Sequence, residues 1–431
     1  MHDAIVVGGG LAGLAAGLRL VRAGRSPLVL EAAHRAGGRM TTDRIDGYAI
    51  DTGVTLLGNR YAAMRAIVDD LALVSAPVGF SLGVADDATH VRGYRARRPL
   101  DVLCDRSLSL RARWAFCRVL WDIVRAGRAM LHGNSDRARA LDRETVAEYV
   151  AHLGPGGREL FAKVFEPGLR AALGGDPGTA SRVVLMQVVW NTLGAGFWNF
   201  AGGVDALPEA MARVVPTELG VTVREVRRVD GGVEVDVEQA GRARTLRARA
   251  AILAVPGHHV PRLLPSAPDW LAAAAARTTF SRIASVHVGL ARPPRCPHTG
   301  FARTQQRDGV GVLELEHLRA PGRCPPGKGM VSVYFVAGVD APDEALRARA
   351  RTVVTDTFPD AAVELEHVIR WPTGIAQFPR GRVAELADLH DRLARWDAPI
   401  AVAGDWLDGV ASESAIRMGQ RAADQILQKL T

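Results

Sequence analysis

The sequence predicts an α/β protein, because a strand, a glycine-rich turn and a helix follow one another at the start of the chain. The first strand, 4–7, is apolar and runs into Gly8, Gly10 and Gly13, which have the spacing G-x-G-x-x-G. In such a unit the first glycine allows the turn, the second lets the backbone approach a pyrophosphate, and the third lets the helix pack on the strand. The opening is therefore predicted to be a Rossmann-like unit that binds a dinucleotide.

A second strand, 27–30, supports this prediction because it ends in Glu31. An acidic residue about twenty positions after the glycines accepts hydrogen bonds from the ribose of a bound dinucleotide. A glycine-rich turn without a ligand is the alternative interpretation. At this point the dinucleotide can be either NAD or FAD.

Length and composition indicate an ordinary folded protein. The 431 residues suffice for two or three units with full cores, and 48% of them are hydrophobic and 23% charged. No charged leader precedes the first strand, and Arg19 interrupts the apolar opening before a membrane span is reached, so we expect a cytoplasmic protein. The net charge of +8 comes from dispersed arginines without a nucleic-acid motif, so no nucleic-acid partner is predicted.

The cysteines are scattered through the sequence and have no partner histidine at metal-ligand spacing. We expect them to be reduced and structural, and we expect no metal site. They are Cys104, Cys117, Cys296 and Cys324.

A glycine pair and an arginine, Gly37, Gly38 and Arg39, follow the second strand. The acid-ended strand with this motif resembles the second nucleotide signature of the FAD-dependent superfamily that contains amine oxidases, protoporphyrinogen oxidases and phytoene desaturases. The resemblance implies FAD as the cofactor and gives Arg39, beside Gly38, a role in holding its phosphates. The chemistry agrees, because a guanidinium beside a glycine turn can reach a diphosphate.

The end of the chain resembles the final motif of the same superfamily. A strand, 399–403, runs into Gly404 and Asp405, and a helical pattern follows. In the superfamily the aspartate contacts the ribityl and phosphate region, and the helix N-terminus faces the flavin pyrimidine. A helix dipole stabilises the negative charge of a reduced flavin, and we expect the backbone N–H groups near Ala415 and Ile416 to do so.

The middle of the chain is predicted to leave the nucleotide-binding unit twice. The pattern from about 76 to 201 is mainly helical, and 200–208 resembles the stretch by which members of the superfamily return to the nucleotide domain. By the same resemblance Val226, in the strand 221–226, presents its backbone to the adenine. A second excursion contains the strands 283–290 and 330–336, which we expect to line a substrate chamber.

We therefore predict a Rossmann-like FAD-binding domain with a discontinuous α+β substrate domain of helices and sheet. The FAD-binding domain is predicted to comprise residues 1–75, 202–268 and 385–431. The substrate domain is predicted to comprise residues 76–201 and 269–384.

The clearest helical pattern, 110–131, is amphipathic and basic, with arginines at seven-residue intervals at Arg111, Arg118 and Arg125. A basic helix that carries tryptophan can lie on a membrane surface. Packing of its apolar side against the core is the favoured interpretation, and peripheral membrane contact stays open. The apolar side comprises Leu110, Trp114, Cys117, Trp121 and Val124.

The resemblance also implies the chemistry, in which a substrate C–H bond transfers hydride to flavin N5 while the protein supplies orientation and a dry cavity. Amine oxidases place a lysine near N5, and the corresponding position here holds Ser285. Trp371 is a candidate for a wall of the flavin face, with an ordinary core tryptophan as the alternative. Further guesses for the pocket are Trp190, Phe197 and Trp198, whereas His258 and His259 are expected to be structural or solvated.

The predicted function is an FAD-dependent oxidoreductase that dehydrogenates or desaturates a largely apolar small molecule, like a protoporphyrinogen oxidase or a desaturase. The lack of a lysine near position 285 weakens the amine-oxidase alternative. A flavin isomerase without net redox turnover and a binding protein of the same fold are further alternatives.

Overall fold

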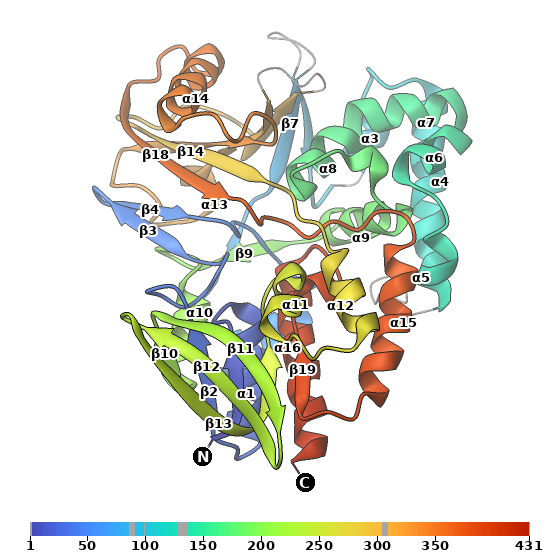
Figure 1. Cartoon of the computed structure of the whole chain (residues 1–431). Helices are drawn as coiled ribbons and strands as arrows, with labels where there is room; N and C mark the ends of the chain where they lie inside the picture. Colours follow the sequence, from blue (N-terminus) through green and yellow to red (C-terminus); the bar gives the residue numbers. More distant parts are fainter. Residues whose placement is uncertain (1, 86–90, 99, 128–135, 304–308, 431) are drawn as a thin grey trace.

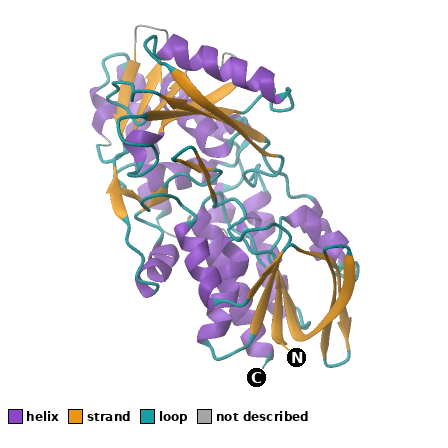
Figure 2. Cartoon of the chain, turned by 90° about the vertical axis from the view of Figure 1, so that its left-hand side faces the viewer, coloured by secondary structure: helices purple, strands orange, loops and turns teal. Residues whose placement is uncertain are grey.

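Two large sheets lie at opposite ends of the molecule, with the helices beside and between them (Figures 1 and 2). The computed structural model describes residues 2–85, 91–98, 100–127, 136–303 and 309–430. The N-terminus and the C-terminus lie near each other at the lower end in Figure 1.

The first sheet contains the predicted Rossmann-like strands. Strands β10, β2, β1, β13 and β19 are parallel, and β12 and β11 extend the sheet as an antiparallel hairpin. Their bounds are β1 His2–Val7, β2 Pro27–Glu31, β10 Thr217–Leu219, β11 Val221–Val229, β12 Gly232–Gln239, β13 Arg242–Leu253 and β19 Ile400–Val402.

Strand β13 belongs to both halves of this sheet. Its first half pairs with β12 and is largely exposed, whereas its second half lies between β1 and β19. The residues 250–253 in that second half are fully buried, as expected for a central parallel strand covered on both faces.

Helices α1 (Leu11–Arg22), α10 (Ala206–Val214) and α16 (Ser412–Lys429) pack beside this sheet. The crossing of α1 and α16 depends on a glycine, because a Cβ at Gly419 would lie 2.0 Å from the carbonyl oxygen of Ala12. The first and last helices therefore touch through their backbones.

The second sheet has the order β18, β14, β17, β16, β15, β7 and β8. Helix α14 (Asp343–Thr357) covers one face, with Leu346 and Val354 packed on Val286 and Val333. The bounds are β7 Ser81–Ala85, β8 Val91–Arg95, β14 Ile283–Leu290, β15 Gly300–Arg303, β16 Val310–Leu315, β17 Gly329–Phe335 and β18 Val363–Trp371.

The helical part of the chain lies beside this sheet, at the upper right of Figure 1. It comprises α3 Leu100–Cys104, α4 Leu110–Ala126, α5 Asp136–Leu141, α6 Val146–His152, α7 Gly154–Leu160, α8 Glu166–Leu173 and α9 Arg182–Thr192. The remaining helices are α2 Ala62–Asp70, α11 Val260–Leu263, α12 Asp269–Ala276, α13 Glu316–Arg319 and α15 Arg382–Arg395. Two small sheets consist of β3 Thr42–Ile45 with β4 Tyr48–Asp51, and of β5 Leu57–Gly58, β9 Phe197–Asn199 and β6 Ala76–Val78.

The prediction of a mainly helical segment from residue 76 is wrong at its beginning, where β6, β7 and β8 are strands. Strand β7 pairs in parallel with β15, which follows it by more than two hundred positions in the chain. Strand β8 pairs with β7 at the edge of the sheet, and its sequence lacks an apolar face, so the pattern gives no sign of a strand.

Helix α4 also differs from the prediction. It ends at Ala126, with Gly127 in a left-handed conformation (φ +63°), and the rest of the predicted range lies outside the described residues. The side predicted to pack on the core, with Leu110, Trp114, Cys117, Trp121 and Val124, is exposed instead. The buried face is a different one, which includes Phe116, Val119 and Ile123 together with alanines such as Ala112. A Cβ at Gly156 of α7 would lie 2.4 Å from the carbonyl of Arg111, so the two backbones are in close contact.

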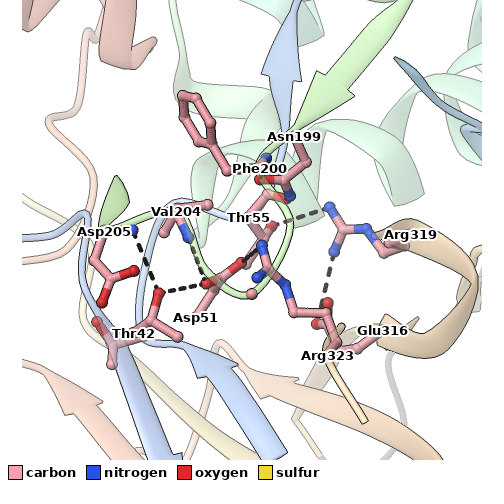
Figure 3. Close-up of polar contacts among 12 residues, drawn as sticks. Thr42, Asp51, Thr55, Asn199, Phe200, Val204, Asp205, Glu316, Arg319 and Arg323 are labelled. Carbon is pink, nitrogen blue, oxygen red and sulfur yellow. Dashed lines mark hydrogen bonds and ion pairs between the residues drawn. The ribbon is translucent and has the colours of Figure 1, made fainter. Parts of the chain in front are cut away.

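A buried ion pair joins the strand β4 to the segment that follows α13 (Figure 3). Arg323 Nη2 lies 2.7 Å from Asp51 Oδ2, and each side chain is only 1% exposed. The other carboxylate oxygen of Asp51 accepts hydrogen bonds from Thr42 and from the backbone N–H of Val204. These contacts fasten together three segments that are far apart in the sequence.

Candidate functional site

One cavity of about 1300 Å³ extends from the glycine-rich turn of the first sheet to the inner face of the second sheet. Typical small-molecule pockets measure roughly 300–1,000 Å³, so this cavity has room for a large cofactor together with a second molecule.

Among the described residues no helix has the length and apolar character needed to cross a bilayer.

The glycine turn is built as the sequence predicts. Gly8 has φ +104°, and a Cβ there would lie 2.5 Å from the carbonyl oxygen of Ala254. A Cβ at Gly13 would lie 1.9 Å from the carbonyl oxygen of Gly8, so only glycine allows this packing of helix on turn. Gly10 lines the cavity, and a Cβ there would meet nothing within 4 Å. The space in front of Gly10 is therefore open to a ligand.

The first turn of α1 faces the same space. Gly10 is its N-cap, and no side chain caps the helix. The unpaired N–H groups of a helix N-terminus, together with the helix dipole, favour an anion such as a pyrophosphate.

Glu31 lies at the edge of the cavity, at the end of β2. Its carboxylate accepts hydrogen bonds from the backbone N–H groups of Gly9 at 2.6 Å and Ala33 at 2.8 Å. The carboxylate thus holds the glycine turn beside the position expected for a ribose.

Arg39 and Asp405 meet in the cavity wall. Arg39 donates to Asp405 Oδ1 at 2.9 Å and also to the carbonyl oxygen of Gly374. Gly38 (φ +57°) and Gly404 (φ +143°) precede them in conformations that favour glycine, and all four of these predicted residues line the cavity. The structure therefore brings together two motifs that the sequence places at its opposite ends.

Helix α16 points its N-terminus at the cavity, again without a side-chain cap. Ala415 lines the cavity, whereas the side chain of Ile416 is fully buried in the core beneath the helix. The carboxylate of Glu413 is turned away from its own helix and accepts hydrogen bonds from the N–H groups of Ala63 and Met64, at the start of α2.

Val226 is not among the residues that line the cavity, and its side chain is fully buried. The residues of β11 that line the cavity are Val221, Thr222 and Val223. The pairing of β11 with β12 shifts between Val223 and Glu225, so the register beyond the shift differs from that of a regular strand.

Trp371 and Ser285, the two residues that the resemblance places near the flavin, both line the cavity. Trp371 lies in the wall, and its indole N–H donates to the carbonyl oxygen of Thr52 at 2.6 Å. Ser285 lies in the wall formed by β14. Of the further candidates for the pocket, Phe197 lines the cavity, whereas Trp190 and Trp198 do not. His259, expected to be structural or solvated, also lines the cavity, and His258 does not.

Three polar residues of the cavity wall are not predicted from the sequence. Glu314, Arg319 and Tyr334 line the wall beside Ser285, and Arg319 forms an ion pair with Glu314. Burial raises the pKa of Glu314 and that of Tyr334. The alternation of 330–336 puts residues 332 and 334 on one face of β17, but only the strand pairing brings that face to Ser285.

The helix N-termini, the arginine and the open space described above suit a dinucleotide, whose diphosphate is negatively charged. Two uncapped helix N-termini, an arginine and an open space at Gly10 border one cavity. Such groups favour a diphosphate and a ring that gains negative charge. The residues present could therefore hold FAD, with its diphosphate at α1 and its ring near α16.

The comparison with protein families agrees with this arrangement. The model of the family described as flavin-containing amine oxidoreductases matches residues 11–427. AofH of Mycobacterium tuberculosis, named as a flavin-containing monoamine oxidase, is 29% identical over 281 residues, which are 60% of this chain and 57% of AofH. The chain thus matches little more than half the length of this relative.

Hydroxyneurosporene desaturase of Cereibacter sphaeroides is 26% identical, and the match covers 99% of this chain and 97% of the desaturase. The solved structure of cyclohexylamine oxidase from Brevibacterium oxydans has a TM-score of 0.76 at 21% identity, with 100% of this chain and 99% of the oxidase covered, which shows a common fold. The chain belongs to the flavin-containing amine oxidoreductases, a family of FAD-dependent oxidoreductases.

Proposed function

We propose that the protein dehydrogenates or desaturates a largely apolar small molecule that lies in the chamber beyond the FAD site. The N-termini of α1 and α16 and the Arg39–Asp405 pair together form the dinucleotide cradle. The observation that carries this proposal is the continuous cavity that joins this cradle to a chamber with mainly apolar walls. Apolar side chains line this chamber from the helices α8 and α9, from the second sheet, from β9 and from the residue before β7. They include Phe80, Leu82, Leu169, Val188, Phe197 and Val312.

The residues of the chain would have three tasks. The N-terminus of α1 and the Arg39–Asp405 pair would hold the diphosphate and ribityl region, and the N-terminus of α16 would face the ring. Trp371, fixed by its hydrogen bond to Thr52, would form a wall that keeps the substrate in place. Bound FAD supplies the acceptor for a hydride from a substrate C–H bond, while the apolar walls exclude water.

The alternative of an amine oxidase has less support. All three lysines of the chain, Lys163, Lys328 and Lys429, are described, and none lines the cavity. Ser285 stands where the resemblance expects the lysine of amine oxidases. The relatives themselves include both amine oxidases and a desaturase.

The test is an anaerobic titration of the FAD-loaded protein with a polyene, a porphyrinogen and an alkylamine. We expect one of the first two to bleach the flavin absorbance in proportion to the amount added. A product formed without bleaching would favour the flavin isomerase instead, and bleaching by the amine alone would favour the amine oxidase. A protein that retains no flavin after gel filtration with excess FAD would contradict all three.

Peripheral contact with an anionic membrane is part of the proposal. Leu110, Trp114, Trp121 and Val124 form an apolar stripe on α4, and between 57% and 80% of each is exposed. Exposed arginines lie along the same helix, so the surface combines apolar anchors with charge complementary to anionic lipid. A membrane is also where a largely apolar substrate accumulates. The arginines are Arg111, Arg118 and Arg125.

A further inference from the structure

A chain of hydrogen bonds leads from the cavity wall into the core of the second sheet. Ser285 Oγ lies 3.0 Å from His287 Nε2, His287 Nδ1 lies 2.7 Å from Ser332 Oγ, and Ser332 Oγ lies 2.8 Å from Glu316 Oε1. None of these four residues is more than 3% exposed. Only Ser285 lines the cavity, so the chain of hydrogen bonds begins at the wall and ends inside the protein.

Strand geometry explains why these residues meet. Ser285 and His287 are two positions apart on β14 and share one face of the sheet. Antiparallel pairing puts Ser332 of β17 opposite His287, and Tyr334 opposite Ser285. The ring of Tyr334 packs edge-on against the imidazole, with 6.0 Å between the ring centroids, and restricts its orientation.

The carboxylate of Glu316 gives this chain of hydrogen bonds its direction. Ser332 donates its single hydroxyl hydrogen to the carboxylate oxygen Oε1 of Glu316. The lone pair of Ser332 Oγ then accepts from Nδ1–H of His287. The guanidinium of Arg319 lies 3.8 Å from the same Glu316 oxygen and compensates its charge (Figure 3).

The tautomer of His287 determines the direction of the hydrogen bond between His287 and Ser285. Burial lowers the pKa of His287 to about 3, so the ring is neutral and carries one N–H, at Nδ1. Nε2 therefore accepts, and the hydroxyl hydrogen of Ser285 is committed to it. Only the lone pairs of Ser285 Oγ remain for a molecule in the cavity.

We propose that Ser285 is the hydrogen-bond acceptor that positions the substrate, and that the substrate is a largely apolar molecule carrying a hydroxyl or an uncharged N–H group. This proposal rests on the proposed function and names the class of its substrate. The charged neighbours Arg319 and Glu314 pair with each other, so the wall favours a neutral donor over an ion. His287, Ser332 and Glu316 are positioning residues, which act through Ser285.

The first test measures the tautomer of His287 by ¹⁵N NMR of the FAD-loaded protein with labelled histidine, and the variant His287→Gln identifies its signals. We expect a protonated Nδ1 and an unprotonated Nε2. In Glu316→Gln the amide can also donate to Ser332, so the tautomer with Nε2–H should appear, whereas the exposed Glu344→Gln should change nothing. A wild-type ring protonated at Nε2 overturns the proposal.

The second test compares cyclohexanol with cyclohexyl methyl ether, which keeps the oxygen lone pairs but lacks the donor hydrogen. Titrations followed by the flavin absorbance should show that the holoenzyme binds cyclohexanol about 3- to 10-fold more tightly, the range expected for one neutral hydrogen bond. Ser285→Ala should remove this preference, and Ser285→Thr should retain part of it. Equal affinities in the wild type, or a preference that survives in Ser285→Ala, contradict the proposal.

The two proposals fail in different ways. A flavin that no candidate substrate reduces contradicts the proposed dehydrogenation but leaves the tautomer of His287 and the preference for cyclohexanol as they are. A normal reduction by a substrate without any O–H or N–H, with full activity in Ser285→Ala, contradicts the role of Ser285 alone.

Discussion

Arg39 and Asp405 lie 366 positions apart in the sequence and form a two-pronged ion pair, with Nη2–Oδ1 and Nη1–Oδ2 distances of 2.9 Å each. The side chain of Asp405 is 11% exposed and that of Arg39 is 31% exposed, so the guanidinium remains accessible from the cavity. One arginine thus joins the two ends of the cradle and is still available to a diphosphate.

Replacement of this arginine should weaken FAD binding. A charged hydrogen bond contributes about 1.5–3 kcal/mol, so Arg39→Ala should raise the Kd for FAD about 10- to 100-fold. Arg39→Lys should lie between the two because lysine has no planar fork. The measurement is a fluorescence titration of apoprotein with FAD. Arg282→Ala, which removes an exposed ion pair with Asp340, is the control and should bind FAD normally.

Substitution of two glycines in the turn should affect the Tm and the FAD affinity differently. Gly10→Ala adds a methyl group to open space, so it should leave the Tm unchanged and weaken FAD binding. Gly13→Ala should lower the Tm as well, because its Cβ would collide with the carbonyl oxygen of Gly8. Gly79→Ala, whose Cβ also meets nothing within 4 Å and which does not line the cavity, should change neither property. Normal FAD affinity in Gly10→Ala would show that the diphosphate lies elsewhere.

The buried pair of Asp51 and Arg323 should be costly to break. Removal of one partner leaves an uncompensated buried charge, which typically costs about 3–5 kcal/mol. Arg323→Met should therefore lower the free energy of unfolding by roughly that amount. The double variant Asp51→Asn with Arg323→Met should recover part of the loss, since no charge is then left unpaired. Chemical denaturation measures both, and equal losses in the single and double variants would argue against a coupled pair.

Stability should fall on mild acidification because of His390. This residue of α15 is 3% exposed, and its Nε2–H donates to the carbonyl oxygen of Leu407 at 2.8 Å. Burial lowers its pKa to about 4 from an ordinary 6.5, so between these values the unfolded chain binds a proton that the folded chain does not. The free energy of unfolding should therefore decrease as the pH falls from 6.5 to 4, by at most about 3 kcal/mol from this group.

The variant His390→Gln keeps an N–H donor for Leu407 and removes the titrating group. Its stability should depend less on pH in this window than that of the wild type, as measured by urea denaturation at several pH values. His34→Gln, at an exposed position, should follow the wild type. Identical pH profiles for His390→Gln and the wild type would contradict the prediction.

The exposed stripe of α4 should bind anionic vesicles. We expect the protein to co-sediment with vesicles of equal parts phosphatidylcholine and phosphatidylserine, and less so in high salt. The double variant Trp114→Ser with Trp121→Ser should weaken this binding at least about tenfold, because it removes two large apolar anchors. Val74→Ser, which changes an exposed apolar residue outside α4, is the control. A stable dimer that the double variant abolishes would assign the stripe to a second copy of the chain instead.

The glycine turn was predictable because its geometry is local. Gly8 and Gly13 are required by atoms of the same strand–turn–helix unit and of its neighbour β13, and the apolar runs at 4–7, 27–30 and 250–253 reveal the strands of that unit. The strands 283–290 and 330–336 were predictable for the same reason, because their apolar character lies within the segment.

Features that depend on contact between distant segments were not predictable. The buried face of α4 combines alanines with Phe116, Val119 and Ile123 and contacts a glycine of α7, so the exposed tryptophans of the helix gave a misleading signal. The position of Val226 depends on a register shift in β11. The hydrogen bonds that connect Ser285 to Glu316 require the register of β14 on β17 and the position of the start of α13. Neither of these can be inferred from the local sequence pattern.

The crossing of α1 and α16 through Gly419 also has a consequence for biosynthesis. The ribosome makes the glycine turn before α16, so the nascent chain carries only half of the cradle until α16 has emerged. We expect stable FAD binding only after α16 has emerged, so a ribosome stalled before that helix should hold a chain without FAD.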